Sequence, residues 1–212
     1  MIIYLNKTRL LLSILFLLAL NACNCITGEG DVISEERQVS AFTKIKLSAA
    51  TKVILRQDSV FHLKIDGQAN ILDLLKTEVR SKTLSIDFSF RCVRDAKEVT
   101  IYLSMPKLEG IDVSGSGKVI CLRKFRTQDL ELDISGSGEI IIDLSAREIE
   151  SSVNGSGEIE ITGTTKKHTI DINGSGQVYA YDLRSSDTRV KISGSGDAKV
   201  FAVGSLNASV LG

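Results

Sequence analysis

Apolar and polar residues alternate along the second half of this chain, and the alternation recurs in five copies. In each copy an alternating stretch leads into Gly-Ser-Gly, and a second alternating stretch follows. The copies are VSGSGKVIC from Val113, ISGSGEIII from Ile134, VNGSGEIEI from Val153, INGSGQVYA from Ile172 and ISGSGDAKV from Ile192. Because strict alternation is typical of half-buried strands, each copy predicts two short β-strands joined at a corner.

The period of the repeat indicates the fold class. The first glycines of successive copies are separated by 21 (136 − 115), 19 (155 − 136), 19 (174 − 155) and 20 (194 − 174) residues. This period, made only of strands and turns, predicts an all-β parallel β-helix or β-solenoid with coils of about 20 residues. The expected inward columns are Val113, Ile134, Val153, Ile172 and Ile192; Val119, Ile140, Ile159, Val178 and Ala198; and Cys121, Ile142, Ile161, Ala180 and Val200.

We interpret the Gly-Ser-Gly segments as structural corners and not as ligand loops. A phosphate-binding glycine loop lies between a strand and the N-terminus of a helix, and no helical pattern follows these copies. The glycines are expected to supply the positive φ of each corner, and the serines and asparagines beside them to form a hydrogen-bonded ladder. The turn glycines are Gly115, Gly117, Gly136, Gly138, Gly155, Gly157, Gly174, Gly176, Gly194 and Gly196.

The first half of the chain carries a degenerate copy of the repeat. IKLSAATKVIL from Ile45 aligns with IDVSGSGKVIC from Ile111, with Ala49 and Thr51 at the glycine positions. FHLKIDG, TLSIDFSF and KEVTIYLSMP are typical of strands, and NILDLLKTEV predicts one or two helical turns. We therefore expect one domain at 39–212, with a broader β layer at 39–106 and regular repeats at 107–212.

The N-terminus has the pattern of a bacterial lipoprotein signal. Lys7 and Arg9 precede an apolar run at 10–20, which is shorter than the ~20 residues of a membrane span, although a retained anchor helix is the alternative. LNAC resembles a lipobox, so we expect a signal peptide at 1–22, lipidation of Cys23, and a tether with the first strand at 23–38. Because Asn24 and not Asp follows Cys23, the outer membrane is the expected location, on its periplasmic or its surface face.

Composition excludes one class of partner. Lys and Arg number 26, Asp and Glu number 26, and the formal net charge is +0, so a nucleic-acid partner is not expected. Aromatic residues make up 5% and Trp is absent, which leaves few rings that could stack on sugars or bases.

The cysteines predict one disulfide. If Cys23 carries lipid, three cysteines remain in an oxidising envelope. Cys25 and Cys92 lie in polar, turn-like segments, whereas Cys121 belongs to an apolar column. The asymmetry favours a Cys25–Cys92 bridge with a buried, inert Cys121. No metal-ligand spacing is present, so neither a metal nor a cofactor is expected.

Candidate catalytic residues are few. The two histidines, His62 and His168, form no recognisable triad or metal pattern with other residues. Glu139 and Glu158 fall at equivalent positions of adjacent coils, where a carboxylate pair could perform acid/base chemistry. A solvated face of mixed charge is the favoured interpretation of these positions. We expect no catalytic residues.

Several segments together resemble a known family. They are CNCITGEGDVISEERQVSAFTKIKLS, ILDLLKTEV, IYLSMPKLEGIDVSGSGKV and the later SGSG and NGSG turns. The chain from about Cys25 to Gly212 is similar to putative auto-transporter adhesin, head GIN domain proteins, which are common in Bacteroidetes. The resemblance implies a right-handed parallel β-helix and an adhesin-like function, and it brings no catalytic residues.

Two functional hypotheses follow. The first is a non-enzymatic, lipid-anchored envelope protein that presents a stiff surface for adhesion or as a scaffold. The alternative is a glycan-binding or carbohydrate-active protein, similar to lyases or glycosidases, on the same fold. Expected partners are the membrane, through the lipid, and a glycan or protein ligand. Leu206 to Gly212 leads into a sixth corner whose edge is left open, so we expect either that the segment at 203–212 is the least protected part of the domain or that a second copy covers it end to end.

Overall fold

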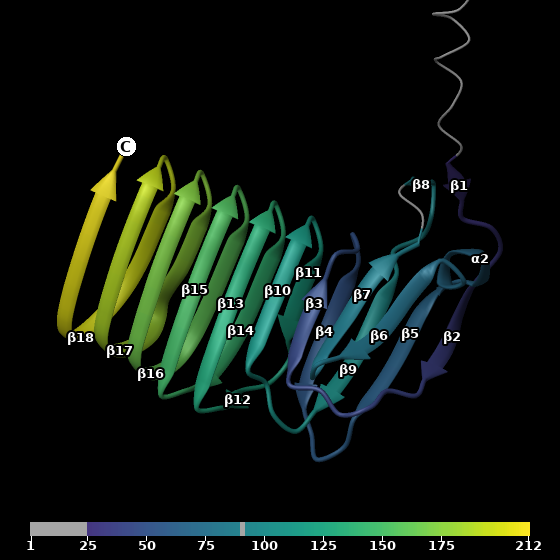
Figure 1. Ribbon diagram of the computed structural model, residues 1–212, viewed down its shortest axis with the longest axis horizontal. Helices are drawn as coiled ribbons and strands as arrows, with labels where there is room; N and C mark the ends of the chain where they lie inside the picture. The colour runs from purple at the N-terminus through teal and green to yellow at the C-terminus, as the bar shows by residue number, and fades with distance from the viewer. Residues whose placement is uncertain (1–24, 90–91) are drawn as a thin grey trace, which may run out of the picture.

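The structure, a computed structural model, describes residues 25–89 and 92–212. They form an elongated stack of β coils, with β18 (Asp197–Leu211) at one end and β1 (Ile26–Thr27), β2 (Val32–Arg37) and α2 (Ala69–Leu72) at the other (Figure 1). The signal at 1–22 and Cys23 lie outside the described residues. No helix in the described part of the chain has the length and apolar character needed to cross a membrane.

Two layers of parallel strands make up the coils. One layer contains β3 (Lys44–Leu47), β10 (Gly110–Gly115), β13 (Asp129–Gly136) and β15 (Glu148–Gly155). The other contains β4 (Lys52–Gln57), β11 (Lys118–Cys121) and β14 (Glu139–Ser145), with β12 (Phe125–Arg126) paired to β14. Three longer strands, β16 (Glu158–Gly174), β17 (Gln177–Gly194) and β18, each pass through both layers and complete a coil apiece.

The strand register confirms the predicted solenoid. Val113 pairs with Ile134, which pairs with Val153, and the same column continues through Ile172 and Ile192. The degenerate first copy stacks as aligned, with Ile45 beside Ile111 and Val53 beside Val119. Buried apolar side chains from Phe42 to Ile192 form one core between the layers. Among the described residues this core is continuous from coil to coil, so we expect segment 25–212 to fold on its own.

The spatial order of the coils differs from their order along the chain. β7 (Thr83–Phe88) pairs with β3, and β9 (Thr100–Met105) pairs with β4, so the coil at 83–105 lies outside the earlier coil at 44–57. The chain then crosses back to place β10 on the other side of β3. The Glu109 amide donates a hydrogen bond to the Thr43 carbonyl (2.7 Å) at this crossing.

Antiparallel strands close the N-terminal end of the stack. β5 (His62–Gln68) pairs with β9, β6 (Leu75–Arg80) pairs with β7, and β2 pairs with β5. α2, a single turn within the segment predicted to be helical, joins β5 to β6 and buries Ile71 and Leu72. These strands cover the backbone edges of β9 and β7, and β2 and β6 become the edge strands at this end of the stack.

The two glycines of each corner serve different purposes. Gly155 has a φ of +128°, a region that side-chain-bearing residues rarely adopt, and the first glycines of the other regular corners are alike. Gly157 has no positive φ, but a Cβ there would lie 2.5 Å from the Cγ2 of Ile134. Positive φ was expected at both glycines, and that expectation is wrong for the second, which is required by close packing.

Backbone groups, and not serine hydroxyls, connect successive corners. The Ser156 amide donates to the Gly136 carbonyl and the Ser175 amide to the Gly155 carbonyl, both at 2.8 Å. Among the side chains in the two predicted rows, one inter-coil bond is present in the described structure, from Asn173 Nδ2 to Asn154 Oδ1 (3.2 Å). The side-chain ladder of serines and asparagines predicted from sequence is therefore wrong, because one such bond is present in the described structure. Backbone amides join successive corners instead.

Candidate functional site

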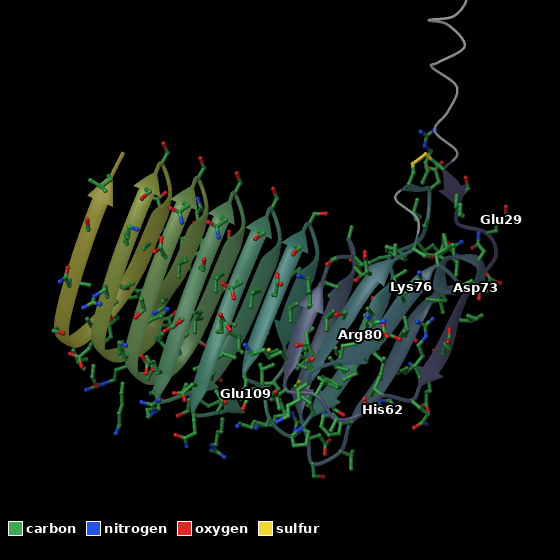
Figure 2. All side chains as sticks on the ribbon, viewed as in Figure 1. Glu29, His62, Asp73, Lys76, Arg80 and Glu109 are labelled. Carbon is green, nitrogen blue, oxygen red and sulfur yellow. A yellow bond between two sulfur atoms is a disulfide. The ribbon has the colours of Figure 1, made fainter. Side chains whose placement is uncertain are left out.

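The start of the described chain is fixed to the capped end of the stack. Cys25 and Cys92, the pair predicted from sequence, are joined in a disulfide, which Figure 2 shows beside β1 and β8 (Val93–Arg94). Asn70 Nδ2 donates to the Thr27 carbonyl (2.7 Å), and Gln68 Nε2 donates to the Gly30 carbonyl (3.0 Å). Any group attached shortly before Cys25 is thereby held at the end opposite β18.

An acidic groove follows the outer face of β10, β13 and β15. Two hollows of about 490 and 320 Å³ share Lys44 and Glu131 as lining residues. Lys44 Nζ donates to Glu131 Oε2 (2.8 Å) across Gly110, whose missing side chain leaves room between the neighbouring strands. Glu109, at the edge away from the Gly-Ser-Gly corners, also lines the larger hollow (Figure 2).

Asp133 is the electrostatically unusual carboxyl of this groove. Its partial burial raises its pKa to about 6, and the charges of Glu131 and Asp112 add to this increase. Lys46 Nζ lies 3.1 Å from Asp112 Oδ2, so the neighbouring Asp112 has a charge partner of its own. Asp133 therefore gains or loses its proton near pH 6, well above the usual range of an aspartate.

The carboxylate pair considered from sequence lies on a face of mixed charge. Glu139 and Glu158 are neighbours on β14 and β16, as predicted. Lys118 Nζ donates to Glu139 Oε1 (2.7 Å), however, and all of these side chains are partly solvated. The row is a partly solvated face of mixed charge, in which Glu139 already has a lysine partner, as the favoured interpretation expected.

Aromatic side chains gather near the β18 end. Tyr181 and Phe201, which are 68% and 44% exposed, have ring centroids 6.1 Å apart. With Asp182 and Arg184 they line a shallow hollow of about 310 Å³. Exposed rings beside a carboxylate and a guanidinium suit a ligand that has both apolar and hydrogen-bonding surfaces.

Among the described residues, neither histidine forms a Ser-His-carboxylate triad. His62 is exposed on β5 and lies 3.5 Å from Glu36 Oε1. His168 is buried, its Nε2 lies 2.9 Å from Ser151 Oγ, and burial lowers its pKa to about 4. With no carboxylate bonded to its ring among the described residues, the pair lacks the third group of a triad.

Cys121 is buried, and burial raises the pKa of its thiol well above the usual range, so it is unreactive. Within residues 25–89 and 92–212, no group of three or more His, Cys, Asp or Glu side chains could hold a metal ion.

Sequence reasoning missed Asp133 and the Tyr181–Phe201 pair as candidate site residues. The sequence does contain a signal for Asp133, because Asp112 and Asp133 occupy the same outward position of consecutive coils and their carboxylates are therefore neighbours. The aromatic pair had no such signal. A shift in strand register between Ala180 and Arg184 brings the two rings together, and alignment of the repeats does not predict that irregularity.

Comparison with known proteins identifies the family. The family described as putative auto-transporter adhesin, head GIN domain, matches residues 41–212. The chain belongs to this family. The match confirms the resemblance found from sequence and supports an adhesin-like role in a cell-envelope or surface protein. No curated protein matches the sequence.

Solved structures of Bacteroidetes proteins share the fold of this head GIN domain protein. A putative adhesin from Bacteroides fragilis is 26% identical, with a TM-score of 0.82 over 88% of this chain and 87% of that one. A putative adhesin from Parabacteroides distasonis is 20% identical, with a TM-score of 0.71 over 89% and 97%. A putative lipid binding protein from the same organism is 22% identical, with a TM-score of 0.67 over 88% and 100%.

Proposed function

We propose that this head GIN domain protein is a non-enzymatic lipoprotein of the outer membrane that presents a stiff β-solenoid for adhesion. The observation that carries the proposal is the placement of the Cys25–Cys92 disulfide and β18 at opposite ends of the stack (Figure 1). A lipid on Cys23 would hold one end at the membrane and leave β18 as the distal tip.

Rigidity supports this role. The parallel coils of the described residues share continuous backbone hydrogen bonds and one core, which supports a stiff stack. The disulfide and the hydrogen bonds of Asn70 and Gln68 fix the first described residues to the capped end. A short tether joined to a rigid body would keep the tip away from the membrane surface.

The anchor is tested with Cys23→Ser in the full chain, expressed in a Bacteroidetes host. We expect wild-type protein in the outer-membrane fraction with incorporated fatty acid, and the variant without lipid and released from membranes or uncleaved. Cys121→Ser is the matched control and should behave as wild type. An unlabelled wild-type protein, or a Cys23→Ser protein with unchanged mass and partitioning, would contradict lipid anchoring.

Adhesion is tested with intact cells. Cells that express the protein should attach to immobilised mucin glycoprotein or to a second cell layer better than cells that lack it. Treatment of the cells with protease should remove both the protein and the attachment. Equal attachment of both strains to both surfaces would contradict an adhesive role.

Glycan binding at the tip is a second candidate, favoured by the exposed Tyr181–Phe201 pair with Asp182 and Arg184 beside it. Aromatic rings pack on the apolar faces of sugars, and charged groups bind hydroxyls. We expect Phe201→Ala to weaken binding to a mucin-type oligosaccharide array. Tyr102→Ala is the matched control, since Tyr102 is 37% exposed near the capped end, where Lys64 covers its ring. No binding by wild-type protein would exclude this candidate.

A further inference from the structure

The corners opposite the Gly-Ser-Gly segments are rich in basic residues. They lie at the side of the stack where Figure 1 shows β12, and they connect the second strand layer back to the first. Segments 122–129, 145–148, 164–167 and 184–187 together contain seven basic and three acidic residues, whereas the Gly-Ser-Gly corners contain no charged residue. A chain with a formal net charge of +0 therefore has a local excess of positive charge along one side.

The acidic side chains of these corners do not neutralise this excess. They already have partners, namely Arg147 for Asp129, Lys167 for Glu148 and the Ser205 hydroxyl for Asp187. In the part of the chain that the structure describes, four exposed basic side chains of these corners belong to no ion pair. We call them the basic row; they are Arg123, Arg126, Lys166 and Arg184.

The strand register aligns the basic row with the long axis of the stack. Arg126 pairs with Ser145, Ser145 with Thr164, and Thr164 with Arg184. Neighbouring strands are about 4.8 Å apart, so the two arginines are about 14 Å apart along the stack. Thr164 Oγ1 donates to Ser145 Oγ (3.1 Å) between them. The side chain of Gln57 fixes the backbone of Arg126, because it donates to the Arg126 carbonyl (3.0 Å) and accepts from the Arg126 amide (2.8 Å).

An exposed aromatic ring lies at one end of the basic row. Tyr181 and Arg184 both line the hollow of about 310 Å³ described above. Tyr181 is 68% exposed, and its strand, β17, pairs with β16 on one side and with β18 on the other. A ring beside a guanidinium suits an acidic sugar, whose apolar face packs on the ring while its acid group binds the guanidinium.

We propose that the basic row binds an acidic polysaccharide that lies along the stack. Its carboxylate or sulfate groups contact the basic side chains, and one of its sugars packs on Tyr181. The hydroxyls of Ser145 and Thr164 lie between the two arginines and match sugar hydroxyls as donors and acceptors. This inference rests on the glycan-binding candidate given above, and it names the ligand class as a linear chain with acid groups.

The position of the basic row argues against the anchoring membrane as its partner. Figure 2 shows the disulfide on the side of the stack where the Gly-Ser-Gly corners lie, whereas β12 with Arg126 lies on the opposite side. A lipid shortly before Cys25 would thus leave the basic row facing away from that membrane. Nucleic acid is disfavoured as well, because a protein with a formal net charge of +0 does not attract a densely charged polymer over long range.

The test measures binding of the full chain, in nonionic detergent, to immobilised chondroitin sulfate, a linear polysaccharide with carboxylate and sulfate groups. We expect the wild type to bind chondroitin sulfate but not neutral dextran, with an affinity that falls as salt is added. Arg126→Ala/Arg184→Ala should raise the Kd at least about tenfold, because two charge-assisted contacts are lost. Tyr181→Ala should also weaken binding, but with an unchanged salt dependence.

Arg80→Ala/Arg189→Ala is the matched control. It removes the same charge from exposed sites outside the basic row, and Arg189 lies on β17 itself, in the other strand layer. This variant should bind chondroitin sulfate as the wild type does, and circular dichroism should show that all variants are folded.

Several outcomes would overturn the inference. They are a wild type that does not bind chondroitin sulfate, an equal loss of binding in the control variant, and equally tight binding to duplex DNA or to phosphatidylglycerol vesicles. Cell attachment without chondroitin sulfate binding would contradict the basic row and support adhesion. Chondroitin sulfate binding without cell attachment would support the basic row and contradict adhesion.

Discussion

The Nε2 atom of His168 lies 2.9 Å from the Oγ atom of Ser151, with both side chains buried between the two strand layers. Burial lowers the pKa of this imidazole from 6.5 to about 4. The unfolded chain therefore binds a proton on His168 at a higher pH than the folded protein does. Its contribution makes the free energy of unfolding fall as the pH drops from 6.5 towards 4, by about 3 kcal/mol in total.

We expect His168→Leu combined with Ser151→Ala to remove this pH dependence. Replacing both partners leaves no unsatisfied polar group, so the variant should remain folded. Urea unfolding at pH 7 and pH 4.5 measures the effect. His62→Gln, at an exposed site, should retain the wild-type pH dependence. An unchanged pH dependence in the double variant would show that His168 is not the group responsible.

Asp133 has the opposite effect to His168 on the pH dependence of the free energy of unfolding. Its pKa rises from 3.8 to about 6 in the folded protein, mainly through burial, so the folded state binds a proton that the unfolded chain releases. This group adds stability as the pH falls from 6 to 4. We expect Asp133→Asn to raise the melting temperature at pH 7.5, where the carboxylate lies among like charges, and to change it less at pH 4.5.

Asp171→Asn is the matched control for Asp133. Asp171 lies on the same outward row, and Lys191 Nζ is 3.9 Å from its carboxylate. An exposed pair of this kind contributes little, so the melting temperature at pH 7.5 should not rise. If Asp133→Asn were destabilising at pH 7.5, the repulsion inferred at the acidic groove would be wrong.

Both corner glycines should be sensitive to substitution, for different reasons. Gly155→Val places a β-branched residue at a φ of +128°, and its Cβ would lie 2.6 Å from the Gly136 carbonyl oxygen. Gly157→Val would bring its Cβ within 2.5 Å of Ile134. We expect each to lower the free energy of unfolding by about 3 kcal/mol or more in denaturant titrations. Ser156→Ala, exposed in the same corner, should change it by less than about 0.5 kcal/mol.

Removal of the disulfide should destabilise the capped end. Cys25 and Cys92 are 67 residues apart, and in the chain-entropy model a loop of this length contributes about 4 kcal/mol. We expect the Cys25→Ala/Cys92→Ala variant of segment 25–212 to melt at a lower temperature, to the same extent as reduced wild type. Cys121→Ala should keep its response to reductant. A melting temperature that does not respond to reductant would contradict a stabilising bridge.

The repeat region was predictable because its structure is local and periodic. Alternation on both sides of Gly115, Gly136 and the later corners determines which residues face inward, and equal spacing determines which residues stack. The Cys25–Cys92 pair followed from the same logic, since Cys121 was already assigned to a buried column.

Other features depend on contacts that no periodicity encodes. The coil at 83–105 lies outside the coil at 44–57, because antiparallel β5 and β6 must cover the exposed edge. The raised pKa of Asp133 arises from carboxylates on neighbouring strands and from partial burial. The aromatic hollow requires the register shift that brings Tyr181 beside Phe201.

The sequence by itself determined the coil, its corners and its inward columns, because backbone geometry and apolar spacing act within about twenty residues. Only the tertiary structure decided how antiparallel strands cap the N-terminal end of the stack, which carboxyl is electrostatically perturbed and where the exposed aromatic pair forms. These properties depend on what packs against each strand from distant parts of the chain, and the pattern within a repeat is the same whether or not a neighbour is present.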